Sequence, residues 1–229
     1  MRHLEVIAAM EDEIAGLCST CTRDPVRDGF TIRKSGVGKV NAALAVADAA
    51  RWDPLGIIVV GTAGALAPDL RRGDVVVVNS AMQHDVDASA LDAQRFPRGM
   101  IPFEPTSTWY ANAPLVAAAE QVLRDLDARH TIGGICSGER FLADATEKRF
   151  LHEHFHGACI DMETGAIAQA CAKFQIPWVG IRIMSDGADH DAGAQFTTSL
   201  PVASASIARI IPRLVIAAIA ALAHVPGSP

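Results

Sequence analysis

Two carboxylates, Asp161 and Glu163, stand at the head of a segment that is otherwise almost entirely apolar or small, CIDMETGAIAQAC (residues 159–171). A buried charge needs a partner or a chemical role, because taking a carboxylate out of water is costly. Two further acids of this kind are Glu13, which follows the first apolar run, and Asp186, which follows the run PWVGIRIM. Positioned carboxylates can act as general acids, as general bases or as acceptors for hydroxyl groups.

Apolar runs alternate with amphipathic stretches along the chain, which predicts strands alternating with helices. The helix over 146–155 takes Thr146 as its N-cap and has Gly157 just past its end. Residues 89–113 contain FPRGMIPFEP, whose three prolines predict an irregular connection. The predicted strands are 3–10, 30–38, 56–66, one that begins at 73, 130–138, 158–161 and 177–184, and the predicted helices are 39–51, 113–129, 146–155, 163–175 and 203–225.

This alternation predicts an α/β fold with a largely parallel sheet covered by helices on both faces. No linker divides the chain, so residues 1–229 are expected to form a single domain. Ligands of such folds bind outside the carboxyl ends of the strands. Glu13, Glu163 and Asp186 each follow a predicted strand, and so does the glycine-rich turn over 61–64. We therefore expect all of them at one edge of the sheet.

The composition excludes several other classes of protein. The chain has 229 residues, 50% of them hydrophobic and 20% charged, and a net charge of −6 without a basic run, so a nucleic-acid partner is not expected. The first residues, MRHLEVIAAMEDE, lack the long apolar run of a signal peptide, so none is expected. Residues 210–225 are apolar, but Pro212 and Arg213 interrupt them, which favours a core or interface helix over a membrane span. Five scattered cysteines indicate reduced thiols and a cytoplasmic protein.

Four short motifs partly match known patterns for metal, thiol or phosphate sites. HEHFH, from His152 to His156, matches the zinc-protease pattern. Its helix is short, no third ligand follows at a recognised spacing, and a solvated helix end is the better interpretation. CSTC lacks a second cysteine pair, SGVGKV lacks the residues of a phosphate loop, and DGADHDAG lacks the closing glutamate of a calcium loop. No metal site is expected.

Eight stretches, taken in order, resemble one family. Their spacing is similar to that of the 5′-methylthioadenosine/S-adenosylhomocysteine nucleosidases, a branch of the nucleoside phosphorylase superfamily, over nearly the whole chain. The resemblance implies a three-layer α/β/α fold with a central mixed, mostly parallel sheet, and hydrolysis of an adenine nucleoside by water without a cofactor. The stretches are AMEDEIAGL (9–17), SGVGKVNAA (35–43), GTAGAL (61–66), GDVVV (73–77), QHDVDA (83–88), SGERF (137–141), DMETGAIAQAC (161–171) and RIMSDGAD (182–189).

The resemblance assigns roles to the carboxylates. Asp186 matches the acid that protonates the purine, although the residue alone could equally be a strand-end carboxylate whose pKa backbone N–H bonds lower. Glu13 matches the base that activates water; the choice over its neighbours Glu11 and Asp12 rests on the family alone. Glu163 matches the acceptor of the ribose hydroxyls. Asp161 is expected to have a structural role.

The remaining contacts also follow from the resemblance. Phe141 stacks on the purine, and the backbone of Phe141 and Leu142 reads its edge. Met162 lies against the sugar, and Ser185 positions Asp186. The segment Thr62, Ala63 and Gly64 lines the site near the sugar and the water. Residues 89–105 cover the site of a neighbouring subunit, which implies a homodimer.

Alternatives remain at this stage. A nucleoside phosphorylase would use phosphate in place of water, but three acids at positions 11–13 would repel phosphate. A nucleosidase for another adenosyl compound, futalosine-like or 5′-deoxyadenosine, is also open, as is a zinc protease at His152 and His156. Thr62, Glu139, Arg140 and the pair Thr164-Gly165 depart from the common family pattern, so the reaction type is better defined than the substrate.

Overall fold

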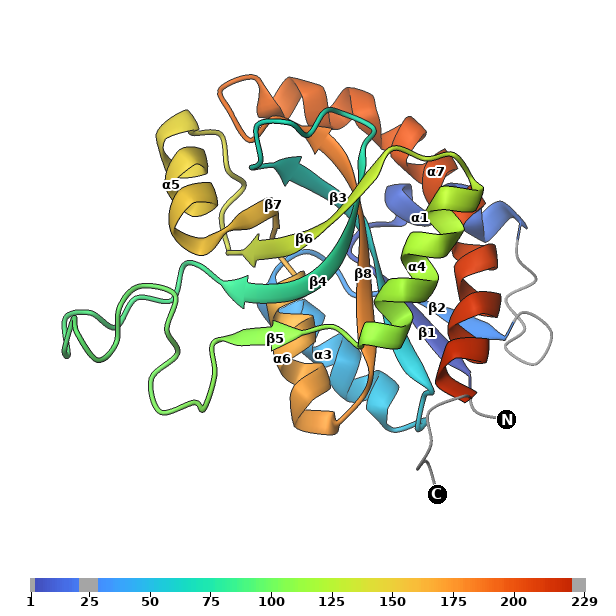
Figure 1. Ribbon diagram of the computed structural model, residues 1–229, viewed down its shortest axis with the longest axis horizontal. Coiled ribbons are helices and arrows are strands. Elements are labelled where there is room, and N and C mark those ends of the chain that lie inside the picture. Colours follow the sequence, from blue (N-terminus) through green and yellow to red (C-terminus); the bar gives the residue numbers. More distant parts are fainter. Residues whose placement is uncertain (1–2, 21–28, 224–229) are drawn as a thin grey trace.

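The computed structural model describes residues 3–20 and 29–223 (Figure 1). Strands and helices alternate along most of the chain, as the α/β prediction requires. The strands are β1 (Leu4–Ala8), β2 (Phe30–Lys34), β3 (Gly56–Ala65), β4 (Val75–Gln83), β5 (Thr108–Tyr110), β6 (His130–Ser137), β7 (Gly157–Asp161) and β8 (Trp178–Asp186); the helices are α1 (Glu11–Thr20), α3 (Lys39–Ala50), α4 (Ala113–Asp125), α5 (Ala145–Phe155), α6 (Thr164–Phe174) and α7 (Ala192–Ala223).

The strands of the described residues form one sheet in the order β2-β1-β3-β7-β6-β4-β5, and β8 pairs with both β3 and β4. Because β3 pairs with β7, β7 with β6, and β6 with β4, the strands β3, β7, β6, β4 and β8 close into a ring. The pairs β3–β7, β4–β5 and β4–β8 are antiparallel and the others are parallel. This confirms the expected mixed, mostly parallel sheet.

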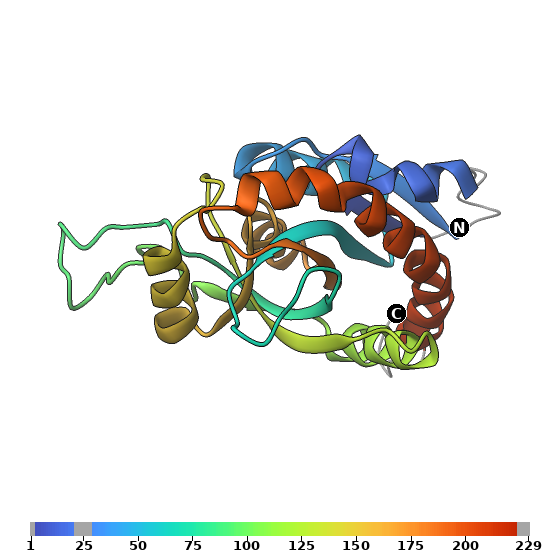
Figure 2. The ribbon, with the colours of Figure 1, turned by 90° about the horizontal axis from the view of Figure 1, so that it is seen from above.

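Helices cover the sheet on two sides. Helices α1, α4 and α7 pack against one face, and α3 and α6 pack against the other (Figures 1 and 2). Each side has its own cluster of buried apolar residues, for example Ile14 and Ile211 on the first side and Val46 and Ile167 on the second. The three-layer prediction is therefore confirmed.

Strands β3 and β8 are buried along their whole length. Both are rich in β-branched residues and are covered on two faces, which is why they read as nearly continuous apolar runs. They pair in parallel, with a register shift between Ala63 and Gly64. The predicted turn at Gly61–Gly64 is wrong: these residues lie within β3. Asp186 is likewise the last residue of β8 and does not follow it. Pairing between the two strands, up to Gly64 with Asp186, keeps Gly61–Gly64 within β3 and extends β8 beyond its predicted end at residue 184.

Helix α7 begins at Ala192, earlier than the predicted start at residue 203. Its first turns are held by bonds to other elements, which sequence periodicity does not reveal. Arg72 donates to Ser199 Oγ at 2.8 Å, and Gln195 Oε1 accepts from Gly187 N at 3.0 Å. The helix contains Pro201 and curves around the sheet (Figure 2). Proline within a helix removes a hydrogen bond and favours bending.

By length and composition, α7 could cross a membrane. In the structure it packs on α1, α4, β3 and β8. Its buried residues Ile207, Ile211, Leu214 and Ala218 recur at helical spacing and join the core cluster. These contacts agree with the prediction of a core helix in this region.

Helix α5 begins with a different cap from the predicted one. Its N-cap is Asp144, not Thr146, because the Asp144 carboxylate accepts from Thr146 N at 2.8 Å and from Glu147 N at 3.1 Å. A carboxylate at this position is also stabilised by the positive end of the helix dipole. The helix ends at Phe155, and His156 adopts the left-handed conformation as C-cap.

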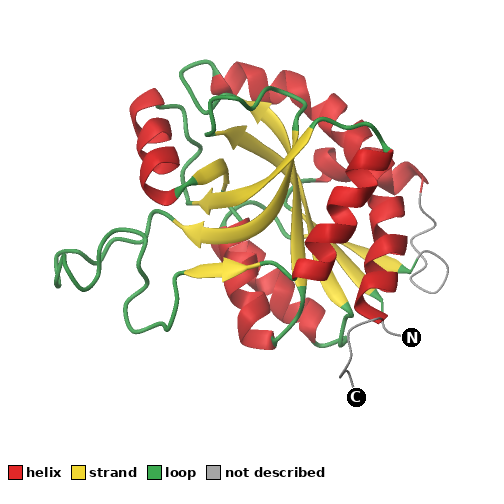
Figure 3. Cartoon of the chain, in the orientation of Figure 1, coloured by secondary structure: helices red, strands yellow, loops and turns green. Residues whose placement is uncertain are grey.

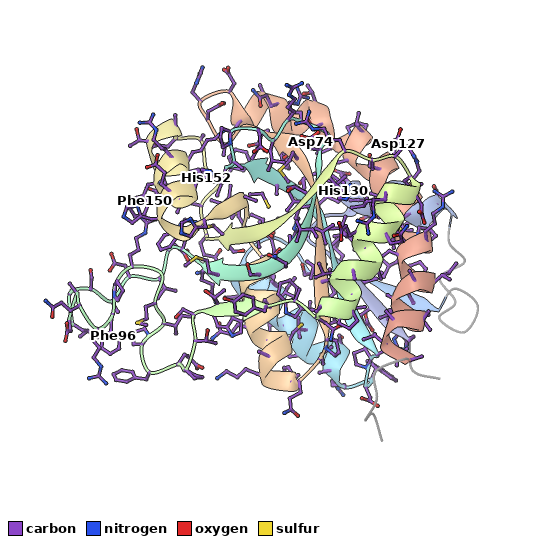
Figure 4. The ribbon with its side chains drawn as sticks, viewed as in Figure 1. Asp74, Phe96, Asp127, His130, Phe150 and His152 are labelled. Atoms are coloured by element: carbon purple, nitrogen blue, oxygen red, sulfur yellow. The ribbon has the colours of Figure 1, made fainter. Side chains whose placement is uncertain are left out.

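Residues 84–107 form an arm without helix or strand that projects from the body (Figures 1 and 3). Figure 4 shows Phe96 in this arm. Its ring packs edge-to-face against Phe103, with the ring centroids 5.3 Å apart. The predicted irregular connection over 89–113 is correct for most of its length. It is wrong at Thr108–Tyr110, where β5 pairs with β4. Such pairing between distant segments leaves little signal in a run of three residues.

Candidate active site

A cavity of about 250 Å³ lies at the carboxyl ends of β1, β3, β7 and β8. Segments that are far apart in the sequence form its wall. This agrees with the expectation that ligands of α/β folds bind at the carboxyl ends of the strands. The wall contains every predicted site residue except Leu142. The lining residues are Ala9, Met10, Glu13, Val37, Thr62, Ala63, Gly64, Phe141, Ile160, Asp161, Met162, Glu163, Ser185, Asp186 and Phe196.

Glu13 enters the cavity from the first turn of α1. Of the three acids in that turn, Glu11 and Asp12 are exposed and Glu13 is buried. Its Oε1 accepts from Thr62 N at 2.7 Å and from Thr62 Oγ1 at 2.8 Å, and its Oε2 accepts from Met10 N at 3.1 Å. Three donors thus fix the carboxylate, which agrees with the choice of Glu13 over its neighbours.

Asp186 lies at the end of β8, in the same wall. Its Oδ2 accepts from Ser185 Oγ at 2.6 Å, and its Oδ1 accepts from Ala188 N at 2.9 Å. Burial raises the pKa of Asp186 above its ordinary value, in spite of these two hydrogen bonds and the Lys148 ammonium, which lower it. Of the two alternatives for this residue, the direction of the shift agrees with the raised pKa.

Glu163 is the N-cap residue of α6, two residues beyond β7. Its Oε1 accepts from Gly38 N at 2.8 Å, which brings the glycine loop before α3 against the cavity. Burial and then the charge of Asp161 raise the pKa of Glu163 to about 7, while Arg182 and the Gly38 amide lower it. A carboxyl group with such a pKa changes its charge near neutrality.

Asp161 combines a structural contact with a place in the wall. Its Oδ2 lies 2.7 Å from Nη2 of Arg182, and both residues are buried. This ion pair agrees with the structural role that we expect for Asp161. Arg182 could not be predicted as the partner, because a charged residue in the middle of a strand of apolar residues carries no signal for the acid that it contacts.

Two aromatic rings stand at the mouth of the cavity. Phe141 is 45% exposed, and it packs edge-to-face against Phe196 with centroids 5.7 Å apart. Phe196 comes from the first turns of α7, which were not predicted to be helical, so it was missed. Two rings at the entrance offer apolar area for a planar ligand.

Leu142 lies behind the cavity. Its side chain is buried in a small cluster with Leu66, Leu151 and Ile160. The role expected from the resemblance concerns the backbone at Phe141 and Leu142, and that role stays a prediction.

The histidines of HEHFH do not form the face that a helical zinc site needs. His156 lies outside α5, and the ring nitrogen Nδ1 of His152 is 2.9 Å from Gly157 O. Figure 4 shows His152 on α5 together with Phe150. The group of possible metal ligands found in the described part of the chain is instead Asp189, His190 and Asp191, which is largely exposed. Cys21 of CSTC lies outside the described residues.

The fold and the pocket define an α/β protein with an acidic nucleoside-sized cavity at the edge of a mixed, ring-closed sheet. Residues 26–219 match the family model described as "Phosphorylase superfamily". The 5′-methylthioadenosine/S-adenosylhomocysteine nucleosidase of Oceanobacillus iheyensis is 32% identical over 226 residues, which cover 92% of this chain and 97% of that protein. The enzyme of the same name from Geobacillus thermodenitrificans is 34% identical over 223 residues, covering 90% and 93%.

Solved structures agree. The 5′-methylthioadenosine/S-adenosylhomocysteine nucleosidase of Neisseria meningitidis, in complex with methylthio-immucillin-A, aligns with a TM-score of 0.85 at 32% identity and covers 94% of this chain and 99% of its own. Futalosine hydrolase of Helicobacter pylori aligns with a TM-score of 0.86 at 27% identity, covering 94% and 97%. The chain therefore belongs to the phosphorylase superfamily and, within it, to the family of 5′-methylthioadenosine/S-adenosylhomocysteine nucleosidases.

Proposed function

We propose that this protein is a hydrolase that cleaves the N-glycosidic bond of 5′-substituted adenine nucleosides such as 5′-methylthioadenosine and S-adenosylhomocysteine. The products are adenine and the 5′-substituted ribose. One observation supports this above all: Glu13, Glu163 and Asp186 line a single cavity. The names of the relatives point to the same substrates.

The reaction needs an acid for the leaving purine. Breaking the bond generates a ribosyl cation and a purine that leaves poorly as an anion, much as in glycoside hydrolysis. We assign this role to Asp186, because burial raises its pKa, which favours the protonated form, and Ser185 fixes its orientation. The proton passes from Asp186 to N7 of the purine as the bond to C1′ breaks.

Glu13 acts on the water. Thr62 and Met10 hold its carboxylate in one place, so a water between Glu13 and C1′ would be oriented and would lose a proton to Glu13 as it attacks. Ala63 and Gly64 lie in the wall beside it. At Gly64 a Cβ would come within 2.9 Å of Asp186 Oδ1, so a larger residue would obstruct the acid.

Glu163 binds the ribose. As a carboxylate it accepts hydrogen bonds from the 2′- and 3′-hydroxyls, while Gly38 N holds its Oε1. Met162 provides an apolar contact for the sugar, and Phe141 and Phe196 cover the purine at the mouth. The backbone at Leu142 reads the edge of the base.

The nearest competing function is a nucleoside phosphorylase. That reaction needs cations around the phosphate. The acids of the first α1 turn stand against it, since Glu13 is buried in the cavity wall. Other adenosyl compounds remain candidates for the substrate, and the resemblance to a futalosine hydrolase keeps that class of nucleoside in the test.

We also propose that the protein acts as a homodimer in the cytoplasm and that methionine salvage uses its products. The side chains of Val40, Leu44 and Phe174 are exposed along the groove between α3 and α6, and Phe103 is exposed in the arm. A second copy of the chain is the occupant that such apolar surface suits best. Light scattering on the purified protein tests this: a mass of one chain would contradict the dimer.

A chromatographic assay for released adenine tests the function. The substrates are 5′-methylthioadenosine, S-adenosylhomocysteine, 5′-deoxyadenosine, adenosine and inosine, each with and without phosphate. We expect adenine from the first two compounds without phosphate, and no stimulation by phosphate. A strict requirement for phosphate would establish a phosphorylase instead. Absence of base release from every nucleoside, with a folded protein, would overturn the proposal.

A further inference from the structure

Arg182 of β8 is a cation buried behind the cavity wall, with 1% of its surface exposed. Its Nη2 lies 2.7 Å from Asp161 Oδ2, and its Nη2 and Nε donate to Thr164 Oγ1 at 2.7 and 3.2 Å. The Thr164 hydroxyl in turn donates to Asp161 Oδ2. This hydroxyl therefore bridges the two charges, because it accepts from the cation and donates to the anion.

Asp161, the anion of this pair, also accepts several hydrogen bonds. Asp161 Oδ1 accepts from Ser137 Oγ at 2.5 Å, and Asp161 also accepts from Thr164 N at 3.0 and 3.2 Å. Ser137 Oγ accepts from Gly165 N at 2.8 Å. Thus β6, β7, α6 and β8 each contribute to one buried network. A fully bonded network of this kind keeps a charge in a fixed place.

The guanidinium lies close to Glu13, and its charge attracts both Glu13 and Glu163. A Cβ built on Gly61 would lie 2.2 Å from Arg182 Nη1 and 2.7 Å from Glu13 Oε1, so the two groups converge on the space that a side chain at position 61 would fill. Arg182 also attracts Glu163 and opposes the burial and the Asp161 charge that raise the pKa of Glu163 to about 7. A small movement of Arg182 would change this balance, because Coulomb energies depend on distance and are weakly screened in a buried site.

Other polar groups surround Glu163 from neighbouring elements. Gly38 N donates to it from the loop before α3, and Asp186 lines the same cavity from the end of β8. Lys39 is directed elsewhere, since its Nζ pairs with Asp85 at 2.7 Å, and its N donates to Glu139 Oε1. The position of Arg182 is therefore what sets the positive charge near Glu163.

We propose that Thr164 is a positioning residue for the reaction: its hydroxyl and Asp161 together fix Arg182 where its charge favours the ionised form of Glu163. The inference rests on the proposed function, because an ionised Glu163 is what accepts both ribose hydroxyls. Thr164 itself does not line the cavity. Its effect on the reaction passes through Arg182 and Glu163.

The test compares Thr164→Val, which removes the hydroxyl at nearly constant volume, with Thr164→Ser, which keeps it. The matched control is Thr31→Val, because Thr31 Oγ1 is buried without a hydrogen-bond partner. In profiles of kcat/KM against pH for adenine release, we expect the acidic limb of Thr164→Val to move up from about 7 by about half a unit to one unit, and activity at pH 7 to fall about two- to fivefold. Thr164→Ser and Thr31→Val should keep the limb of the unmodified protein.

A second measurement does not depend on activity. A ¹³C-NMR titration of the glutamate carboxyl carbons, with Glu163 assigned through Glu163→Gln, follows the ionisation of Glu163 in the protein without ligand. We expect a higher midpoint in Thr164→Val and an unchanged one in Thr31→Val. If Thr164→Val does not fold, Thr164→Ala, which suits the first turn of a helix, makes the same comparison.

The two proposals can fail separately. If the unmodified protein releases no adenine, the proposed function fails, and the titration still decides the role of Thr164. If adenine is released but Thr164→Val keeps both the acidic limb and the midpoint of the unmodified protein, the positioning role is refuted. A lower melting temperature with an unchanged limb and midpoint would show a structural role alone and would also overturn the inference.

Discussion

Gly61 is the point in β3 at which Glu13 and Arg182 approach each other, and Gly61→Ala tests that arrangement directly. The new Cβ would lie 2.2 Å from Arg182 Nη1 and 2.7 Å from Glu13 Oε1, and real Cβ contacts are not this short. The Gly61 φ of 156° is also a backbone conformation that favours glycine. The substitution therefore combines a clash with backbone strain.

The size of the destabilisation depends on whether the side chains around Gly61 can move away from the new Cβ. Arg182 is buried and held by Asp161 and Thr164, so it cannot swing into solvent. Overpacking of such a site costs about 1–3 kcal/mol, and the strained backbone adds about 1–3 kcal/mol. We expect Gly61→Ala to lower the free energy of unfolding by about 2–6 kcal/mol, a large part of the ~5–15 kcal/mol of an ordinary protein.

Gly73→Ala is the matched control. Gly73 has a φ of +87°, but a Cβ there would meet nothing within 4 Å. This variant carries strain without a clash and should lose only about 1–2 kcal/mol. Urea unfolding followed by circular dichroism gives both values, and adenine release should be lost or greatly reduced in Gly61→Ala alone. If the two variants were equally stable and equally active, the reasoning about Glu13 and Arg182 would be refuted.

Three other substitutions test the carboxylates. Asp186→Asn and Glu13→Gln should each lower turnover at least about 100-fold, as expected for a lost general acid or base, and normal turnover in steady-state assays would remove that residue from the mechanism. Glu163→Gln should impair both binding and turnover of the nucleoside. Because the pKa of Glu163 rises from 4.5 to about 7 on folding, the folded protein holds the extra proton between these values and loses stability as pH rises through them. Glu163→Gln should therefore be more stable than the unmodified protein above pH 7, by an amount on the order of 3 kcal/mol, and equally stable below about pH 4.5, as thermal unfolding would show.

Much of the site could be predicted because each acid follows an apolar run. Parallel strands bring their carboxyl ends together, so Glu13, Glu163 and Asp186 were expected at one edge, and they line one cavity. The ordered motifs then chose Glu13 among three adjacent acids, and burial makes the same choice. For these residues local sequence and topology agree.

The parts that the sequence did not reveal depend on contacts between distant segments. The ring of strands needs β3 to pair with β7 and β8 with β4, and no local pattern encodes those pairs. Phe196 reaches the cavity from the start of α7, which accepts hydrogen bonds from Arg72 and from Gly187 N. Thr146 resembles an N-cap, but Asp144 makes the capping bonds two residues earlier.

Besides the ion-paired Asp161, the cavity wall contains Glu13, Glu163 and Asp186, and these three carboxylates would repel each other if all were ionised. Their surroundings differ. Burial raises the pKa of Asp186. Burial and the charge of Asp161 raise the pKa of Glu163 to about 7, while Arg182 lowers it. Glu13 accepts hydrogen bonds from three donors. Environments that differ in this way assign acid and base roles to chemically similar groups. The buried cation is what allows two carboxylates to face a ribosyl group that becomes positive during the reaction. The position of Arg182, which Asp161 and Thr164 fix, therefore affects the reaction as well as the stability of the fold.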